Sequence, residues 1–137
     1  MGRYSPTQKE AKKRYYIKFK DDPVFKEKRK RLCYAHSKTP KGRLARARRA
    51  AIRRGFTWEI SLEVYAKLLE GSCHYCGGKL NQAGGGLDRK DSAIGYTIEN
   101  VVPCCGNCNK LKNNFLTEDE AVQLIGLLKI IRGGRVW

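Results

Sequence analysis

The segment GLDRKDSAIGYTIENVVPCCGNCNK, residues 86–110, decides how the rest of this chain is interpreted. It contains two carboxylates, Asp88 and Asp91, and a Cys-Cys-x-x-Cys cluster that Asn109 follows directly. Such a segment is either a loop stapled by its cysteines or a catalytic centre that uses the acidic and amide oxygens. The residues on either side of this segment help to decide between the two interpretations.

The cysteines form two C-x-x-C pairs, Cys73 with Cys76 and Cys105 with Cys108, and 28 residues lie between the pairs. Each pair can turn both sulfurs onto one ion, and two pairs complete a tetrahedral Cys₄ zinc site. Four cysteine ligands leave no open position, so the spacing predicts structural rather than catalytic zinc. Cys105 is preferred to Cys104 because only Cys105 has the two-residue spacing to Cys108.

The distribution of apolar residues along the chain bears on where the protein is located. Residues 1–16 contain no apolar segment typical of a signal peptide, so we expect a cytoplasmic protein of a bacterium or a phage-infected host. In that setting paired cysteines are metal ligands rather than disulfides. No run approaches the roughly 18 apolar residues of a membrane span.

The positive charge is confined to one part of the chain. Residues 1–55 carry 20 Lys and Arg against 4 Asp and Glu, whereas residues 56–137 carry 9 against 9. This asymmetry predicts a basic, nucleic-acid-binding helical arm at 1–55 and a near-neutral module at 56–137. The expected contacts to nucleic acid are Arg43, Arg46, Arg48, Arg49, Arg53, Arg54 and Lys110. A membrane surface is disfavoured, because the arm lacks a long apolar face.

Capping residues and hydrophobic periodicity predict a mostly helical chain. The expected helices cover 7–20, a segment that begins at Pro23, 40–54, about ten residues after Ser61, 106–114 and 118–131. In the last helix, Ala121, Leu124, Leu128 and Ile131 are expected to face inward. Short strands are expected at 56–60, 86–89 and 99–104.

The ordered set "C-x-x-C-G … LDR-x-D … GY … ENVVPCC-x-x-CN-x-x-K" resembles the HNH, or ββα-metal, endonucleases, in particular their small phage-type members. The resemblance covers roughly residues 73–116. It implies an α+β, mostly helical fold in which basic helices precede a zinc-stapled ββα-metal module. It also implies that Asp88 and Asn109 hold one catalytic Mg²⁺ or Mn²⁺, that Asn100 braces the loop that carries the base, and that Lys112 lies near phosphate.

The chemistry of these residues is consistent with that assignment. Mg²⁺ prefers oxygen ligands, keeps several waters, and is often held by one or two protein groups plus substrate phosphate. One carboxylate and one amide oxygen, from Asp88 and Asn109, suit such an ion. The ion would polarise the scissile phosphate and stabilise the leaving oxygen.

The sequence departs from the family pattern at Arg89, where most members have a histidine that acts as general base. Arginine stays protonated and cannot be that base, although it can clamp a phosphate. Three interpretations remain open. Asp91 or Tyr96 supplies the base, metal-bound water needs no protein base, or the module binds nucleic acid without cutting it.

The leading prediction is a metal-dependent endonuclease that hydrolyses phosphodiester bonds in DNA, with RNA also considered as a partner. The alternative is a non-catalytic zinc-knuckle protein that binds DNA or RNA, for instance as a subunit of a ribonucleoprotein. Arg89 favours the alternative, whereas the pairing of Asp88 with Asn109 favours the enzyme. The oligomeric state is not predicted.

Overall fold

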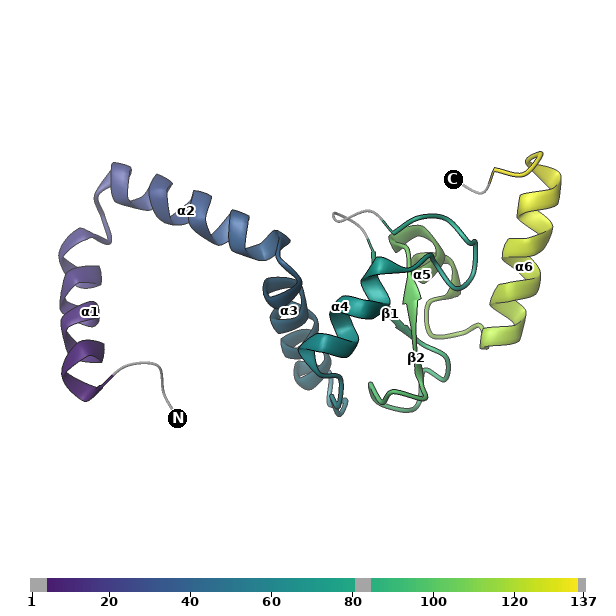
Figure 1. Ribbon diagram of the computed structural model, residues 1–137, viewed down its shortest axis with the longest axis horizontal. Coiled ribbons are helices and arrows are strands. Elements are labelled where there is room, and N and C mark those ends of the chain that lie inside the picture. The colour runs from purple at the N-terminus through teal and green to yellow at the C-terminus, as the bar shows by residue number, and fades with distance from the viewer. Residues whose placement is uncertain (1–4, 81–84, 136–137) are drawn as a thin grey trace. The chain divides into compact units, whose positions relative to one another are not determined.

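The computed structural model describes residues 5–80 and 85–135, which form six helices and one two-stranded sheet (Figure 1). The fold class is α+β and mostly helical, as expected. The chain divides into two compact units, Met1–Ser37 and Lys38–Trp137. No helix in the described part of the chain is long and apolar enough to span a membrane.

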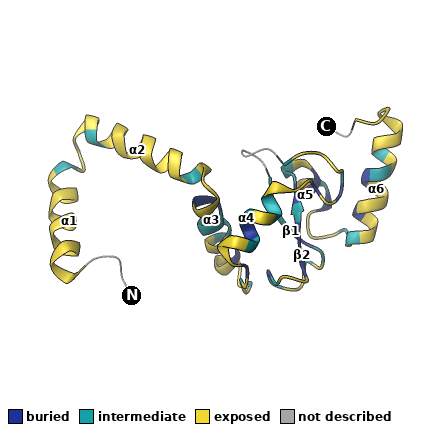
Figure 2. Cartoon of the chain, viewed as in Figure 1, coloured by how far each residue is buried: buried dark blue, intermediate teal, exposed yellow. Residues whose placement is uncertain are grey.

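The first unit consists of α1 (Pro6–Phe19) and most of α2 (Pro23–Lys38). Each begins at a side-chain cap, since Ser5 Oγ accepts from Gln8 N–H at 3.3 Å and Asp22 Oδ1 accepts from Phe25 N–H at 2.7 Å. Neither helix contains a buried residue, as Figure 2 shows. The two helices instead meet at an aromatic cluster of Tyr15, Tyr16, Phe19 and Phe25.

The second unit begins with α3 (Pro40–Arg53), which packs against α4 (Leu62–Glu70). Thr39 caps α3, and Gly55, with a φ of +84°, ends it. Ala51 on α3 is completely buried in a core with Ile60 and Tyr65. Its sequence suggested that α3 belongs to the basic arm, whereas α3 lies in the compact unit Lys38–Trp137 together with the hairpin.

The prediction of a strand at 56–60 is wrong, because this segment forms no strand. The segment makes one isolated bridge, between Trp58 and Tyr96, in which Tyr96 N–H donates to Thr57 O and Glu59 N–H donates to Tyr96 O. The partner segment approaches so closely at Gly95 that a Cβ there would overlap Thr57. The segment 56–60 therefore forms one bridge and no strand ladder. Its alternating apolar residues pack into the core instead.

The module's centre is a hairpin of β1 (Gly86–Arg89) and β2 (Val101–Cys104), in which Asp88 lies opposite Val102. The helix α5 (Gly106–Lys112) follows, and the final helix α6 (Glu118–Ile131) packs against it. The second strand begins two residues later than expected, and α5 ends two residues earlier, at Asn113 with a φ of +51°. Thr117 and Glu120 form a capping box at the start of α6.

The inward face of α6 differs from the expected one. Ala121 and Ile125 are completely buried, whereas Leu124 and Ile131 are 37% and 70% exposed. Leu128 is half-buried. The apolar residues of this helix form two overlapping stripes, so periodicity alone does not show which stripe is buried. Packing against α5 and the cysteine cluster buries the stripe that contains Ala121 and Ile125.

Candidate metal centres and nucleic-acid interface

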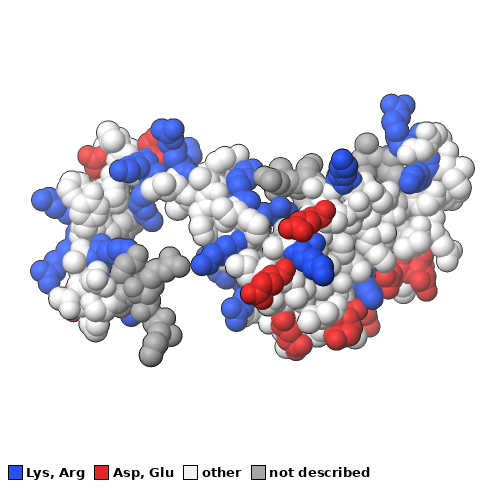
Figure 3. All heavy atoms as spheres, in the orientation of Figure 1, with Lys and Arg blue, Asp and Glu red and all other residues white. Residues whose placement is uncertain are grey.

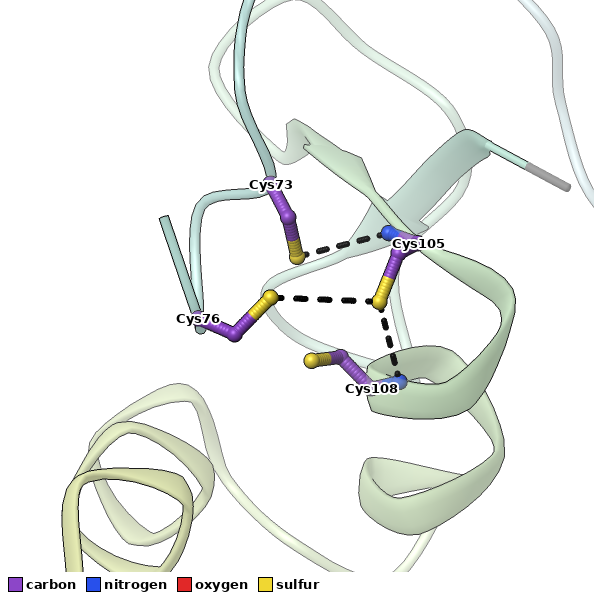
Figure 4. A group of neighbouring side chains, drawn as sticks. All are labelled: Cys73, Cys76, Cys105 and Cys108. Atoms are coloured by element: carbon purple, nitrogen blue, oxygen red, sulfur yellow. Dashed lines mark hydrogen bonds between the residues drawn. The ribbon is translucent and has the colours of Figure 1, made fainter. Parts of the chain in front are cut away.

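Four cysteine sulfurs converge between the turn that follows α4 and the start of α5 (Figure 4). The Sγ atoms of Cys73, Cys76, Cys105 and Cys108 all lie within 4.8 Å of one another. Soft thiolate ligands in a group of four suit a metal ion such as zinc. The expected ligand set is therefore brought together, with Cys105 rather than Cys104 as its third member.

Three backbone amides donate hydrogen bonds to these sulfurs. Gly78 N–H donates to Cys76 Sγ at 3.4 Å, Cys105 N–H to Cys73 Sγ at 3.3 Å, and Cys108 N–H to Cys105 Sγ at 3.4 Å. The last of these bonds makes Cys105 the N-cap of α5. A helix N-terminus favours negative charge, so the ligand also stabilises the helix.

Cys104 is buried beside the cluster but has a different role. Its thiol donates to Cys105 O at 3.3 Å. Hydrogen bonds from the thiols of Cys104 and Cys108 hold the pKa of Cys73 well below its usual range. The hydrogen bond to Cys73, with burial, raises the pKa of Cys104 well above its usual range. Cys104 therefore lies next to the four converging sulfurs without belonging to their group.

The carboxylate of Asp88 connects three parts of the module. Asp88 is 7% exposed, and its Oδ2 accepts from Tyr75 O–H at 2.7 Å and lies 3.3 Å from Lys112 Nζ. Tyr75 belongs to the first cysteine pair, Asp88 to β1 and Lys112 to α5. No described residue donates to Oδ1, and no polar side-chain atom in the described core is both shielded from solvent and unpaired.

Tyr75 was not among the site residues expected from the sequence. Burial, together with its hydrogen bond to Asp88, raises the pKa of Tyr75 well above its usual range, so the phenol stays a neutral donor. Because Tyr75 lies between Cys73 and Cys76, the sequence places it close to the cysteine cluster. The sequence does not show in which direction its side chain points. The neighbouring His74 N–H donates to Pro103 O of β2 at 2.8 Å, so this turn is held against the hairpin that carries Asp88.

Lys112 was expected near phosphate, but its side chain is fully buried. Its ammonium donates to Arg89 O at 2.9 Å in addition to pairing with Asp88. Asn109 is exposed and lies one turn before Lys112 on α5. Residues three apart on a helix are neighbours, so Asn109 lies next to Lys112 on the surface of α5. No hydrogen bond joins Asn109 to Asp88 in the described part of the chain.

Arg89 projects to the other face of the hairpin, because successive side chains of a strand alternate. It is 4% exposed. Its guanidinium carbon lies 3.7 Å from the ring centre of Phe56 and 5.4 Å from that of Tyr96, and Nη1 donates to Ile94 O at 3.0 Å. The group expected to clamp phosphate is thus enclosed by aromatic rings, an arrangement that itself stabilises the cation.

The two candidate bases differ in accessibility. Asp91 is exposed, and its Oδ1 accepts from Ala93 N–H at 2.8 Å. Tyr96 is 8% exposed, and its hydroxyl accepts from Arg54 Nη2 at 3.0 Å. Asn100 braces the intervening loop, since it accepts from Asp91 N–H and donates to the carbonyls of Asp91 and Gly95.

Most of the basic residues expected to bind nucleic acid lie on the surface. Those exposed to solvent are Arg46, Arg48, Arg49, Arg53, Arg54 and Lys110. Arg43 is instead 8% exposed and donates through Nη2 to Gly85 O, at the start of β1. On the face that Figure 3 shows, Lys and Arg are spread over α1 and α2 with few acidic residues among them, whereas Asp and Glu gather along one edge of the second unit.

Comparisons with known proteins agree with this architecture. The chain is similar to the rare-cutting HNH restriction endonuclease PacI, with a TM-score of 0.51 and 25% identity over 61% of this chain and 72% of that one. The chain shares its fold with an HNH endonuclease. It is also 33% identical over 73 residues to an uncharacterised protein of Acanthamoeba polyphaga mimivirus, of whose length it spans 14%. No family profile matches the chain.

Proposed function

We propose that this protein is a metal-dependent nuclease that hydrolyses phosphodiester bonds in DNA. The observation that carries the proposal is the position of Asp88. Its Oδ2 is held by Tyr75 and Lys112 of α5, while no described residue donates a hydrogen bond to Oδ1. A carboxylate fixed through one oxygen has the other available to bind a cation in a set direction.

The oxygen donors near this carboxylate suit Mg²⁺ or Mn²⁺. Asp88 would provide one ligand, and the exposed Asn109, three residues before Lys112 on α5, would provide the second through its amide oxygen. When bound, the ion would polarise the scissile phosphate and stabilise the leaving oxygen. Lys112 balances the charge on Oδ2, and Tyr75 fixes the orientation of the carboxylate.

Asp91 is the stronger of the two candidate bases. Its carboxylate is exposed on a loop that Asn100 holds at three points, whereas the Tyr96 hydroxyl is buried and accepts a hydrogen bond from Arg54. A general base must reach the attacking water, so access favours Asp91. Arg89, enclosed by Phe56 and Tyr96, would position the loop and add positive charge to it.

The remaining parts have supporting roles in this proposal. A structural zinc in the four-cysteine site would hold the turn of Tyr75 against α5, which carries Asn109. The basic helices α1 and α2 would contact the phosphate backbone without reading its sequence.

A non-catalytic nucleic-acid-binding protein is the second candidate. It is favoured by the ion pair between Asp88 and Lys112, which gives the carboxylate a structural role without any metal. It is also favoured by Arg89, which cannot replace a basic histidine.

The deciding experiment incubates supercoiled plasmid, and separately a labelled RNA, with the zinc-loaded protein and Mg²⁺ or Mn²⁺. We expect the wild type to nick or linearise DNA, and Asp88→Ala and Asn109→Ala to bind DNA equally well without cutting it. If the wild type binds but never cuts with either metal, the second candidate replaces the nuclease. If Asp88→Ala cuts at the wild-type rate, the proposed metal centre is wrong.

A further inference from the structure

A hollow of about 360 Å³ opens on the second unit, between α3, the segment after it and the start of β1. Its lining combines three arginines with three aromatic residues: Arg43, Arg46, Arg54, Trp58, Tyr65 and Tyr96. No carboxylate contributes to the lining. The hollow belongs to neither the cysteine cluster nor the surroundings of Asp88.

The arginines make the hollow positive. Arg46 and Arg54 are exposed, and Arg43 is anchored at the rim by its bond to Gly85 O. The charges of Arg43 and Arg46 also oppose the rise that burial causes in the pKa of Tyr65, so both guanidinium groups act on that phenol. Several cations around a low-dielectric concavity concentrate the field on an entering anion.

The aromatic side chains that line the hollow are held in place by contacts within the protein. The rings of Trp58 and Tyr96 are 4.7 Å apart at 31°, and Trp58 Nε1 donates to Ile60 O at 2.9 Å. Arg54 donates through Nη2 to the Tyr96 hydroxyl at 3.0 Å and through Nε to Ala50 O at 3.1 Å. The Arg54 guanidinium is therefore oriented along the rim, and little ordering would be lost on binding.

We propose that this hollow binds one backbone phosphate of a nucleic acid, as an anchor separate from the phosphate that is cut. Arginine presents a planar fork that matches phosphate oxygens. Ala47 and Ala50 in the lining are small, and a Cβ built on Gly86 would meet no atom within 4 Å, so a sugar-phosphate chain has room to approach.

The anchor is distinct from the cutting site because of strand geometry. Leu87 contributes to the lining of the hollow, and the next side chain along β1, Asp88, projects to the opposite face of the hairpin. The proposal rests on the nucleic-acid-binding part of the proposed function but not on catalysis. It would hold for a protein that binds DNA and never cuts it.

The first test compares two double variants with equal charge loss. Arg46→Gln with Arg54→Gln removes two arginines of the hollow, whereas Arg48→Gln with Arg49→Gln removes two exposed arginines of α3 outside it. Affinity for a short labelled duplex DNA is measured by fluorescence anisotropy over a range of NaCl concentrations, without added divalent ions. We expect the hollow pair to lower affinity about tenfold more than the control pair. We also expect it to reduce the slope of log K against log salt by about 1.

The second test fills the hollow without changing charge. Ala47→Leu and, separately, Ala50→Leu add bulk to its lining, and thermal unfolding and zinc content establish that each variant is folded. We expect at least one folded variant to weaken DNA binding severalfold. Two folded leucine variants with wild-type affinity, or equal losses in the two arginine pairs, would overturn the proposal.

The closing experiment observes the hollow directly. The sequence has two tryptophans, so Trp137→Phe leaves Trp58 in the lining as the one fluorophore of its kind. We expect duplex DNA to change Trp58 emission, and the hollow pair of arginine variants to remove that change at saturating DNA. Unchanged emission at saturation would mean that the hollow is empty in the complex. Plasmid cleavage measured on the same proteins fails or succeeds independently, so it separates this proposal from the nuclease.

Discussion

Lys112 and Asp88 form an ion pair of 3.3 Å in which the lysine side chain is completely buried. The pair joins α5 to β1, and the Tyr75 hydroxyl completes it from the first cysteine turn. A buried charge needs its partner, because an unpaired ion in a low-dielectric interior is strongly destabilised. In the proposed nuclease, Oδ1 of the same carboxylate would be the oxygen that binds the metal ion.

Lys112→Met should therefore lower the free energy of unfolding by about 3–5 kcal/mol, since it leaves Asp88 buried without its counter-charge. Lys110→Met, on the exposed side of the same helix, is the matched control and should change stability by less than about 0.5 kcal/mol. Denaturant unfolding of the zinc-loaded proteins measures both. Equal effects of the two variants would show that the pair contributes little.

Tyr75→Phe should lower the rate of DNA cleavage about 10- to 100-fold, the usual effect of removing a group that orients a metal ligand. The affinity for DNA should stay unchanged, because Tyr75 is buried away from the surface. Binding of Mn²⁺ followed by electron paramagnetic resonance should weaken in parallel. Cleavage at the wild-type rate would exclude a role for this hydroxyl in orienting Asp88.

Cys105→Ser should remove the zinc and abolish cooperative unfolding, because structural zinc contributes directly to folding free energy. Two controls sharpen the test. Cys33→Ser changes an exposed thiol, and Cys104→Ala changes a buried thiol outside the ligand set, so both should retain one zinc per chain. Native mass spectrometry counts the metal. Zinc loss in Cys104→Ala would mean that the two adjacent cysteines share ligation.

Removing residues 1–37 should leave the module folded and flatten the salt dependence of DNA binding, because most of the basic arm is lost. Removing residues 1–55 should in addition unfold the module, since α3 carries Ala51 into its core. Circular dichroism and anisotropy titrations compare the two truncations. A folded protein without residues 1–55 would contradict the packing of α3.

Asp91→Asn should lower cleavage by about 10²- to 10⁴-fold if Asp91 is the general base. The amide oxygen of asparagine can still accept from Ala93 N–H, so the loop is preserved while the base is lost. Arg89→His serves as a comparison, and it should not raise activity, because its position faces Phe56 and not Asp88. Wild-type activity of Asp91→Asn would favour metal-bound water that needs no protein base.

Local signals in the sequence were sufficient for much of the architecture. The helices after Thr39, Ser61 and Thr117 begin where they were predicted, because each cap acts through backbone amides only two or three residues away. The convergence of four cysteines was also predictable, since each C-x-x-C pair closes a short turn and one ion can take both pairs. Composition alone revealed the basic segment.

The site itself was decided by tertiary contacts. Nothing local to Lys112 indicates that it is buried against Asp88 rather than exposed to phosphate, because that depends on how α5 packs on the hairpin. The enclosure of Arg89 by Phe56 and Tyr96 likewise joins segments far apart in the chain. Side-chain spacing fixes which residues share an element, whereas desolvation and pairing between elements determine which charged group stays accessible to a ligand.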